Sequence, residues 1–108
     1  MKISKVCELL RAEQICGEGD REVSGGYAGD FLSNCMGKAV SDGVWLTVMN
    51  NVNVAAVAVL CEVGAVVLCE GVRPSPALEQ KCRDQGIFLL STPFDVFQSC
   101  GLLYPELK

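Results

Sequence analysis

The sequence contains no histidine, and this absence limits its chemistry more than any other feature of its composition. Histidine is the commonest general base, the commonest metal ligand and the side chain that titrates near neutral pH. A Ser-His-Asp or Cys-His-Asn triad therefore cannot form within these 108 residues. The pattern also offers no matched carboxylate pair and no base that would activate a cysteine. We predict that the chain is not an enzyme, with no catalytic residue, no metal and no cofactor.

Clusters of basic residues are missing as well. Nine Lys and Arg stand against 13 Asp and Glu, giving a net charge of −4, and no basic run occurs. Nucleic-acid binding needs clustered Lys and Arg to neutralise phosphates, so we predict no DNA or RNA partner. The apolar stretch 52–69 contains Asn53, Glu62 and Gly64, which favours a buried helix and strand over a membrane span. No membrane association is predicted.

The seven cysteines contain no CxxC pair of the kind that structural zinc and redox sites use. Their number is odd, and several lie inside apolar runs, as Cys61 and Cys69 do, where a free thiol acts as a small core side chain. We favour core positions over a metal or cluster site. Reduced cysteines and the lack of a targeting segment predict a cytoplasmic protein.

Half of the residues are hydrophobic, and the mean hydropathy of +0.32 is high for a monomer. A length of 108 residues matches one domain, so residues 1–108 are predicted to form a single unit. Either its core is large or part of its apolar surface is covered by another chain. Because large exposed apolar patches mark interaction sites, we predict a homo-oligomer, most simply a homodimer.

Helical and extended patterns alternate along the chain. Helices are predicted over residues 2–11, 30–39, 54–63, 76–85 and 93–103, with Ser4, Asp30, Asn53 and Thr92 as N-caps and Pro105 as the final stop. Extended segments are predicted over residues 13–16, 23–29, 44–49, 65–70 and 87–90. From residue 44 onward the spacing is that of βαβ units. The predicted fold is therefore α/β, with a small, mostly parallel or mixed sheet flanked by helices.

A glycine-rich segment follows Asp20 and Arg21. Its glycines lack the G-x-G-x-x-G spacing of a dinucleotide site, and Gly37-Lys38 lacks the other residues of a Walker A loop. The backbone around Ser24, Gly25 and Gly26 could still hold an anion, and Arg21 could clamp a carboxylate or phosphate. The alternatives are that the glycines allow close chain packing and that Arg21 forms a surface ion pair.

A second polar group follows the predicted strand at residues 44–49. Thr47, Asn50, Asn51 and Asn53 stand where ligands commonly bind in open α/β sheets, at the carboxyl end of a strand. Asparagine can hydrogen-bond a polar ligand but cannot act as an acid or base at neutral pH. The alternative is a capped loop with no ligand.

Several blocks together resemble the DRTGG domain. They are residues 20–27 (DREVSGGY), 29–33 (GDFLS), 43–47 (GVWLT), 53–58 (NVAAVA) and 90–93 (LSTP). That family is a small α/β regulatory domain found between CBS domains in nucleotide-regulated pyrophosphatases, and it is similar to the N-terminal domain of HPr kinase. The resemblance implies a cytoplasmic domain that dimerises and supports regulation. Asn51 stands where members often carry histidine, and Ser24 where threonine is usual.

These observations lead to two functional hypotheses. The first is a non-catalytic regulatory or dimerisation domain that senses a nucleotide or another small anionic ligand. The alternative is a protein-interaction subunit that docks onto a separate enzyme or kinase and binds no small molecule. The candidate ligand-binding residues are Arg21, Ser24, Gly25, Gly26, Thr47, Asn50, Asn51 and Asn53.

Overall fold

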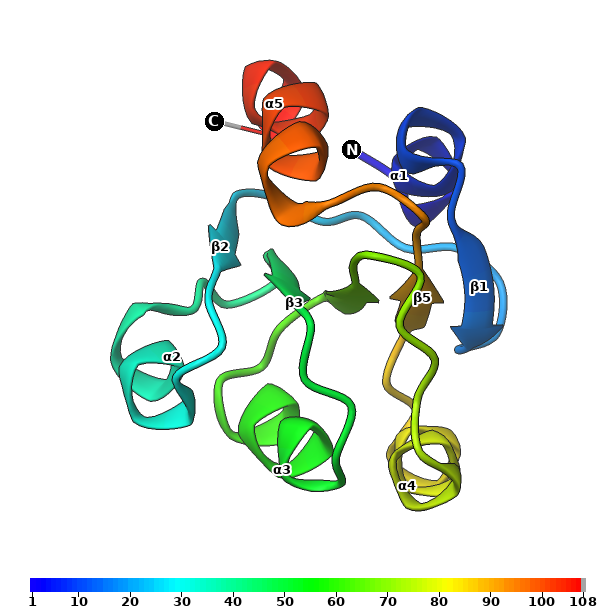
Figure 1. Cartoon of the computed structure of the whole chain (residues 1–108), viewed down its shortest axis with the longest axis vertical. Coiled ribbons are helices and arrows are strands. Elements are labelled where there is room, and N and C mark those ends of the chain that lie inside the picture. Colours follow the sequence, from blue (N-terminus) through cyan, green and yellow to red (C-terminus); the bar gives the residue numbers. More distant parts are fainter. Residues whose placement is uncertain (108) are drawn as a thin grey trace.

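Within residues 1–107, which the computed structural model describes, five short strands form one mixed sheet (Figure 1). Lys108, the last residue of the predicted domain, lies outside the described residues. The strands are β1 (Glu13–Cys16), β2 (Gly26–Ala28), β3 (Val44–Thr47), β4 (Ala65–Leu68) and β5 (Leu89–Ser91). The helices are α1 (Ile3–Leu10), α2 (Leu32–Lys38), α3 (Asn53–Leu60), α4 (Pro76–Gln85) and α5 (Val96–Leu107).

The strand order is β1-β5-β4-β3-β2, so β1 and β2 form the two edges of the sheet. Strands β2 to β5 run parallel to one another, with α2, α3 and α4 as the connections, and β1 pairs with β5 in the antiparallel direction. A parallel pair needs such a crossover connection, which the alternating sequence pattern supplies. The predicted α/β fold with a mixed sheet is confirmed.

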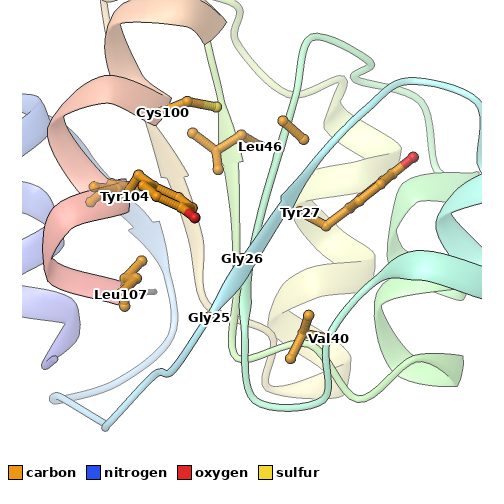
Figure 2. A pocket seen from close by; sticks show the side chains of 10 residues that line it. Gly25, Gly26, Tyr27, Val40, Leu46, Cys100, Tyr104 and Leu107 are labelled. Atoms are coloured by element: carbon orange, nitrogen blue, oxygen red, sulfur yellow. The ribbon is translucent and has the colours of Figure 1, made fainter.

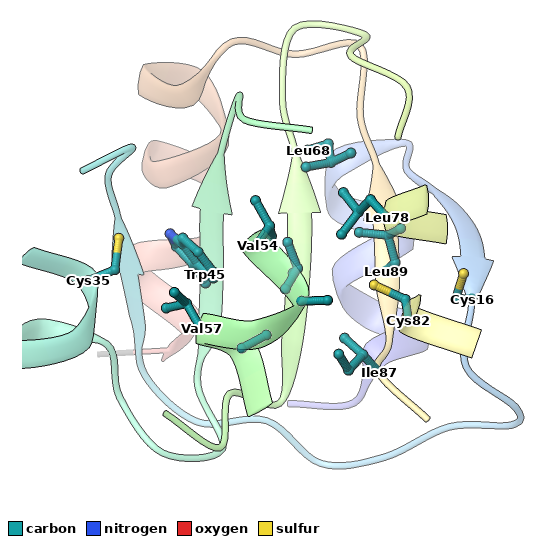
Figure 3. Packing of buried hydrophobic residues seen from close by; sticks show 13 residues of the cluster. Cys16, Cys35, Trp45, Val54, Val57, Leu68, Leu78, Cys82, Ile87 and Leu89 are labelled. Carbon is teal, nitrogen blue, oxygen red and sulfur yellow. The ribbon is translucent and has the colours of Figure 1, made fainter. Parts of the chain in front are cut away.

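The central strands β3 and β4 are buried along their whole length. Successive side chains of a strand point to opposite faces, so both faces must be covered. Trp45 and Val66 face the core that α3 and α4 cover (Figure 3), whereas Val44 and Val67 face the core that α1 and α5 cover. Figure 1 shows the same division, with α1 and α5 on one side of the sheet and α2, α3 and α4 on the other.

Helix α4 has the bounds that the sequence predicts because its end signals are local. Pro76 opens the helix, where its missing N–H costs nothing, and the hydroxyl of Ser75 accepts from the N–H of Leu78 at 3.1 Å. Gly86 ends the helix in the left-handed region, with φ of 68°.

Helices α1, α2 and α3 lack the predicted side-chain caps. Ser4 lies inside α1, and its hydroxyl donates to Oδ2 of Asp20 at 2.6 Å. Asp30 lies before the start of α2 and accepts hydrogen bonds from the β3 end instead. Asn53 is the first residue of α3 rather than its cap, and α3 ends at Leu60, earlier than predicted. The extended segment predicted over 23–29 shortens to the three residues of β2.

Helix α5 continues past Pro105, which was predicted to end it. The proline ring removes one backbone donor from the last turn, a cost that tertiary contacts can offset. Leu107 packs against the core under α1 and α5, and its carbonyl accepts from the N–H of Gly25 at 3.2 Å. The last turn of α5 is therefore held by the segment that leads into β2.

Thr92, predicted as the N-cap of α5, instead joins the end of β5 to α1. Its buried hydroxyl donates to the carbonyl of Leu10 at 2.6 Å. Asp95 caps α5, because its Oδ1 accepts from the N–H of Gln98 at 2.7 Å. Sequence proximity suggested the cap, but the burial of Thr92 gives its hydroxyl a partner 82 residues away.

We expect Thr92→Val to lower the free energy of unfolding by about 1–3 kcal/mol, because the buried Leu10 carbonyl loses its donor. Urea unfolding followed by the fluorescence of Trp45, the single tryptophan, measures this loss. Thr92→Ser is the matched control, since it keeps the hydroxyl and should retain most of the stability. A loss in Thr92→Val no larger than that in Thr92→Ser would contradict this role of the hydroxyl.

Candidate functional site

The candidate ligand-binding residues lie at opposite ends of the sheet. Arg21, Ser24 and Gly25 precede β2, where the parallel strands begin, and Gly26 is the first residue of that strand. Thr47 ends β3, and the three asparagines follow it, where the parallel strands finish. Because β2 and β3 run parallel and in register, the two groups are separated by the length of the strands. The structure does not bring them into one site.

Of the group at the start of the strands, Arg21 and Ser24 line a polar hollow of about 470 Å³ that holds two cations and two carboxylates, whereas Gly25 and Gly26 line a different hollow. Nη2 of Arg21 lies 2.7 Å from Oδ1 of Asp42, and the terminal ammonium of Met1 lies 3.0 Å from Oε2 of Glu22. An anion that entered this hollow would have to replace a carboxylate as the partner of Arg21. Arg21 therefore forms the surface ion pair that was the alternative to ligand binding.

Asp20 has a structural role that the sequence did not reveal. Its Oδ1 accepts from the N–H groups of Ser4 and Arg21, each at 3.0 Å, and its Oδ2 accepts from the Ser4 hydroxyl. The carboxylate therefore satisfies a free donor in the first turn of α1 and sits at the positive end of that helix. The hydrogen bonds from Ser4 are the main cause that lowers the pKa of Asp20. No local signal predicts this cap, because 16 residues separate the partners.

Asp30 organises the group at the other end of the strands. Its Oδ1 accepts from the hydroxyl of Thr47 at 2.6 Å and from the N–H of Val48 at 2.9 Å. The preceding carbonyl, that of Gly29, accepts from Nε1 of Trp45 at 2.9 Å. These bonds tie the loop after β2 to the loop after β3. Thr47, predicted as a ligand contact, therefore bonds to Asp30 and holds the two loops together. Asp30, predicted as a helix N-cap, is instead the acceptor that joins these loops.

The three asparagines mainly shape the loop between β3 and α3. Nδ2 of Asn50 donates to the carbonyl of Arg73 at 3.0 Å, which links this loop to the one after β4. Oδ1 of Asn51 accepts from the N–H of Asn53 at 2.9 Å and so begins α3. All three residues are exposed. This part of the loop matches the capped-loop alternative, except that the accepting oxygen comes from Asn51 and not from the predicted cap, Asn53.

A hollow that the sequence did not predict, here called the β2–α5 pocket, lies between the edge strand and the last helix. Its volume is about 390 Å³, within the range of small-molecule sites. Figure 2 shows Leu46, Cys100, Tyr104 and Leu107 gathered on one side of β2, while the ring of Tyr27 points to the other. The strand residues on the α5 side are small, since Gly26 has no side chain and Ala28 only a methyl group. The hollow results from those two small residues.

The four buried cysteines offer no reactive thiolate. Burial raises the pKa of Cys69 to about 11 and that of Cys82 to about 12, and it raises the pKa values of Cys16 and Cys35 as well. At neutral pH these groups are thiols, which are poor nucleophiles and poor metal ligands. Among residues 1–107, no group of three or more Cys, Asp or Glu side chains is arranged to hold a metal ion. No helix in that range is long and apolar enough to cross a membrane.

Comparison with known proteins gives a fold but no family. No protein-family model and no curated protein matches the chain. Among solved structures, it is similar to the CBS and DRTGG domains of the regulatory region of a Clostridium perfringens pyrophosphatase, complexed with the activator diadenosine tetraphosphate. The TM-score is 0.77 and the identity 15%, over 97% of this chain and 46% of that one.

This chain thus spans less than half the length of that regulatory region. At such low identity the likeness shows the fold alone. The DRTGG resemblance of the sequence is supported at the level of the fold, and membership of the family itself stays a prediction.

The cap that Asp20 gives α1 makes stability depend on pH. A carboxyl whose pKa is lower in the folded state stabilises the fold above its unfolded value, here 3.8, and loses that contribution as the pH falls through its folded value. We expect Asp20→Ala to melt at a lower temperature than the wild type at pH 7, and the difference to shrink below pH 3.8. Melting curves of both proteins from pH 7 to 2.5 measure it. A difference that does not change with pH would assign the effect to packing.

Proposed function

We propose that this chain is a non-catalytic regulatory domain that acts by association, first of all with a second copy of itself. Two features of the surface carry the proposal. Polar side chains that could serve chemistry are engaged in structural hydrogen bonds, whereas large apolar side chains remain exposed. The fold likeness to the regulatory region of a pyrophosphatase supports the same reading by analogy.

The exposed apolar side chains are numerous for a chain of this size. Phe97 is 90% exposed, Phe31 74% and Tyr104 68%. The others are Met36, Val40, Val52, Val59, Leu60 and Leu102. Three of these nine side chains, Phe97, Leu102 and Tyr104, belong to the single helix α5, and grouped apolar side chains mark interaction sites more often than scattered ones do. Association with another protein surface therefore accounts for these residues better than catalysis does.

We expect the purified protein to have twice the mass of one chain at micromolar concentration. Sedimentation equilibrium over a hundredfold range of concentration gives the mass and the dissociation constant. The apolar surface that drives association should keep the dimer intact in 1 M salt, which screens charge pairs but not apolar contacts. A single-chain mass throughout the range would contradict self-association and favour the docking subunit instead.

A second candidate function is the sensing of a nucleotide or another small anionic ligand. The observation that favours it is the similar regulatory region, which was determined with diadenosine tetraphosphate bound. In this chain, the polar hollow at Arg21 and Ser24 is the better placed of the two predicted groups. An arginine and an ammonium line it, and a phosphate could take the place of Asp42 beside Arg21.

A thermal-shift screen with adenine and guanine nucleotides, diadenosine tetraphosphate and polyphosphate tests this second candidate. A ligand at 100 times its dissociation constant should stabilise the fold by about 2.7 kcal/mol. Arg21→Ala should abolish the shift, and Asp42→Asn should increase it, because Arg21 is then released from its carboxylate. Asn51→Ala, at the other end of the strands, is the matched control and should leave the shift unchanged. A shift lost in Asn51→Ala but kept in Arg21→Ala would move the site to the loop after β3.

A further inference from the structure

The outer edge of β2 carries backbone groups without partners. The N–H of Val44 donates to the carbonyl of Gly25, and the N–H of Gly29 donates to the carbonyl of Leu46. In a parallel pair alternate residues bond to the neighbour, so the N–H and C=O groups of Gly26 and Ala28 point away from β3. Within residues 1–107, no hydrogen bond to these outward groups is formed. They are free to pair with another strand.

The two edges of the sheet differ in how they are protected. Natural proteins guard an edge strand with charge, proline or a bulge. The β1 edge has such features, since Glu13 is ion-paired with Arg73 and the register shifts between Gln14 and Cys16. The β2 edge, with the sequence Gly-Tyr-Ala, has no charged residue, no proline and no register shift. The length of three residues limits pairing with another strand, but it leaves the outward backbone groups of β2 open to one.

The β2–α5 pocket lies directly beside this edge. Tyr104 borders it from α5, and 68% of that side chain is exposed. Figure 2 shows the ring on the α5 side of β2, next to the hollow that the small strand residues leave. One surface therefore holds both a hollow and an exposed aromatic ring. A two-fold symmetric interface requires such self-complementarity, because the same patch meets itself.

Charge favours a second copy of this chain as the occupant. Each copy carries a net charge of −4, which opposes association wherever charged faces meet. The residues that line the β2–α5 pocket and form β2 include no Asp, Glu, Lys or Arg. Two copies can meet at this face without burying or opposing like charges there. An acidic or basic peptide would find no counter-charge on it.

We propose that β2 pairs antiparallel with β2 of a second copy, so that one sheet runs through both chains. The proposal rests on the self-association proposed above and names its surface. Gly26 and Ala28 exchange backbone hydrogen bonds across the two-fold axis. That axis brings the two α5 helices to the same face of the joined sheet, where the Tyr104 rings cover the two pockets.

Two variants test the interface by different physical routes. Tyr104→Glu places a charge on the exposed ring position and should raise the dimer dissociation constant by at least about tenfold, as the loss of a central aromatic anchor does. Ala28→Pro removes an outward N–H while leaving the bonds to β3 in place, and it should have a similar effect. Phe97→Glu, on the same helix but outside the pocket, is the matched control and should leave the constant unchanged.

Sedimentation equilibrium measures the constants, and the fluorescence of Trp45 on the adjacent strand shows that each variant is folded. Amide hydrogen exchange gives an independent readout, since the N–H groups of Gly26 and Ala28 should be protected in the dimer and not in the Tyr104→Glu monomer. A wild-type dimer that Tyr104→Glu and Ala28→Pro both leave unchanged, or whose two amides exchange freely, would overturn the β2 interface but not self-association. A wild type that is monomeric throughout would overturn both.

Discussion

The structure depends on one constraint, the need to bury both faces of the adjacent parallel strands β3 and β4. Every residue of both strands is buried, so each face of the sheet must be covered by helices. Helices α3 and α4 cover one face beside Trp45, and α1 and α5 cover the other beside Val44 and Val67. The two edge strands, β1 and β2, are each covered by a neighbouring strand on one side only. Glu13 of β1 is ion-paired with Arg73, whereas β2 pairs with β3 on one side and has an open edge on the other.

The sequence predicts the elements that the central constraint governs, and it fails where a polar side chain bonds across the fold. The strands at Val44 and Ala65 and helix α4 follow from apolar runs and from end signals within a few residues. The predicted caps Ser4, Asp30 and Thr92 fail together, because each side chain bonds to a residue at least 16 positions away. Such bonds depend on where two segments meet in space, which no local pattern records.

The candidate site shows the same limit in another form. A pattern of polar residues after a strand marks a sheet end, but it does not say which groups share that end. Arg21 and Asn51 were predicted for one ligand and lie at opposite ends of the parallel strands. Their hydrogen-bonding capacity is also partly used, since Arg21 pairs with Asp42 and Asn51 opens helix α3. A hydroxyl, amide or guanidinium can bind a ligand only with the hydrogen-bonding capacity that its partners within the fold leave free.

The glycine-rich segment has a structural consequence that neither prediction included. It was interpreted as an anion cradle or as a place of close packing, yet its small residues leave an edge strand bare and a hollow beside it. A strand of three residues offers few backbone hydrogen bonds to a partner strand. Ser24 and Gly25 join the hollow at Arg21 directly to that strand. Their N–H groups donate to the backbone carbonyls of Asp42 and Leu107. An anion that displaced the Asp42 carboxylate would act beside the same short segment that we propose as the contact between two copies. By thermodynamic linkage, ligand affinity and dimer affinity would then change together, which is the property that a regulatory domain requires.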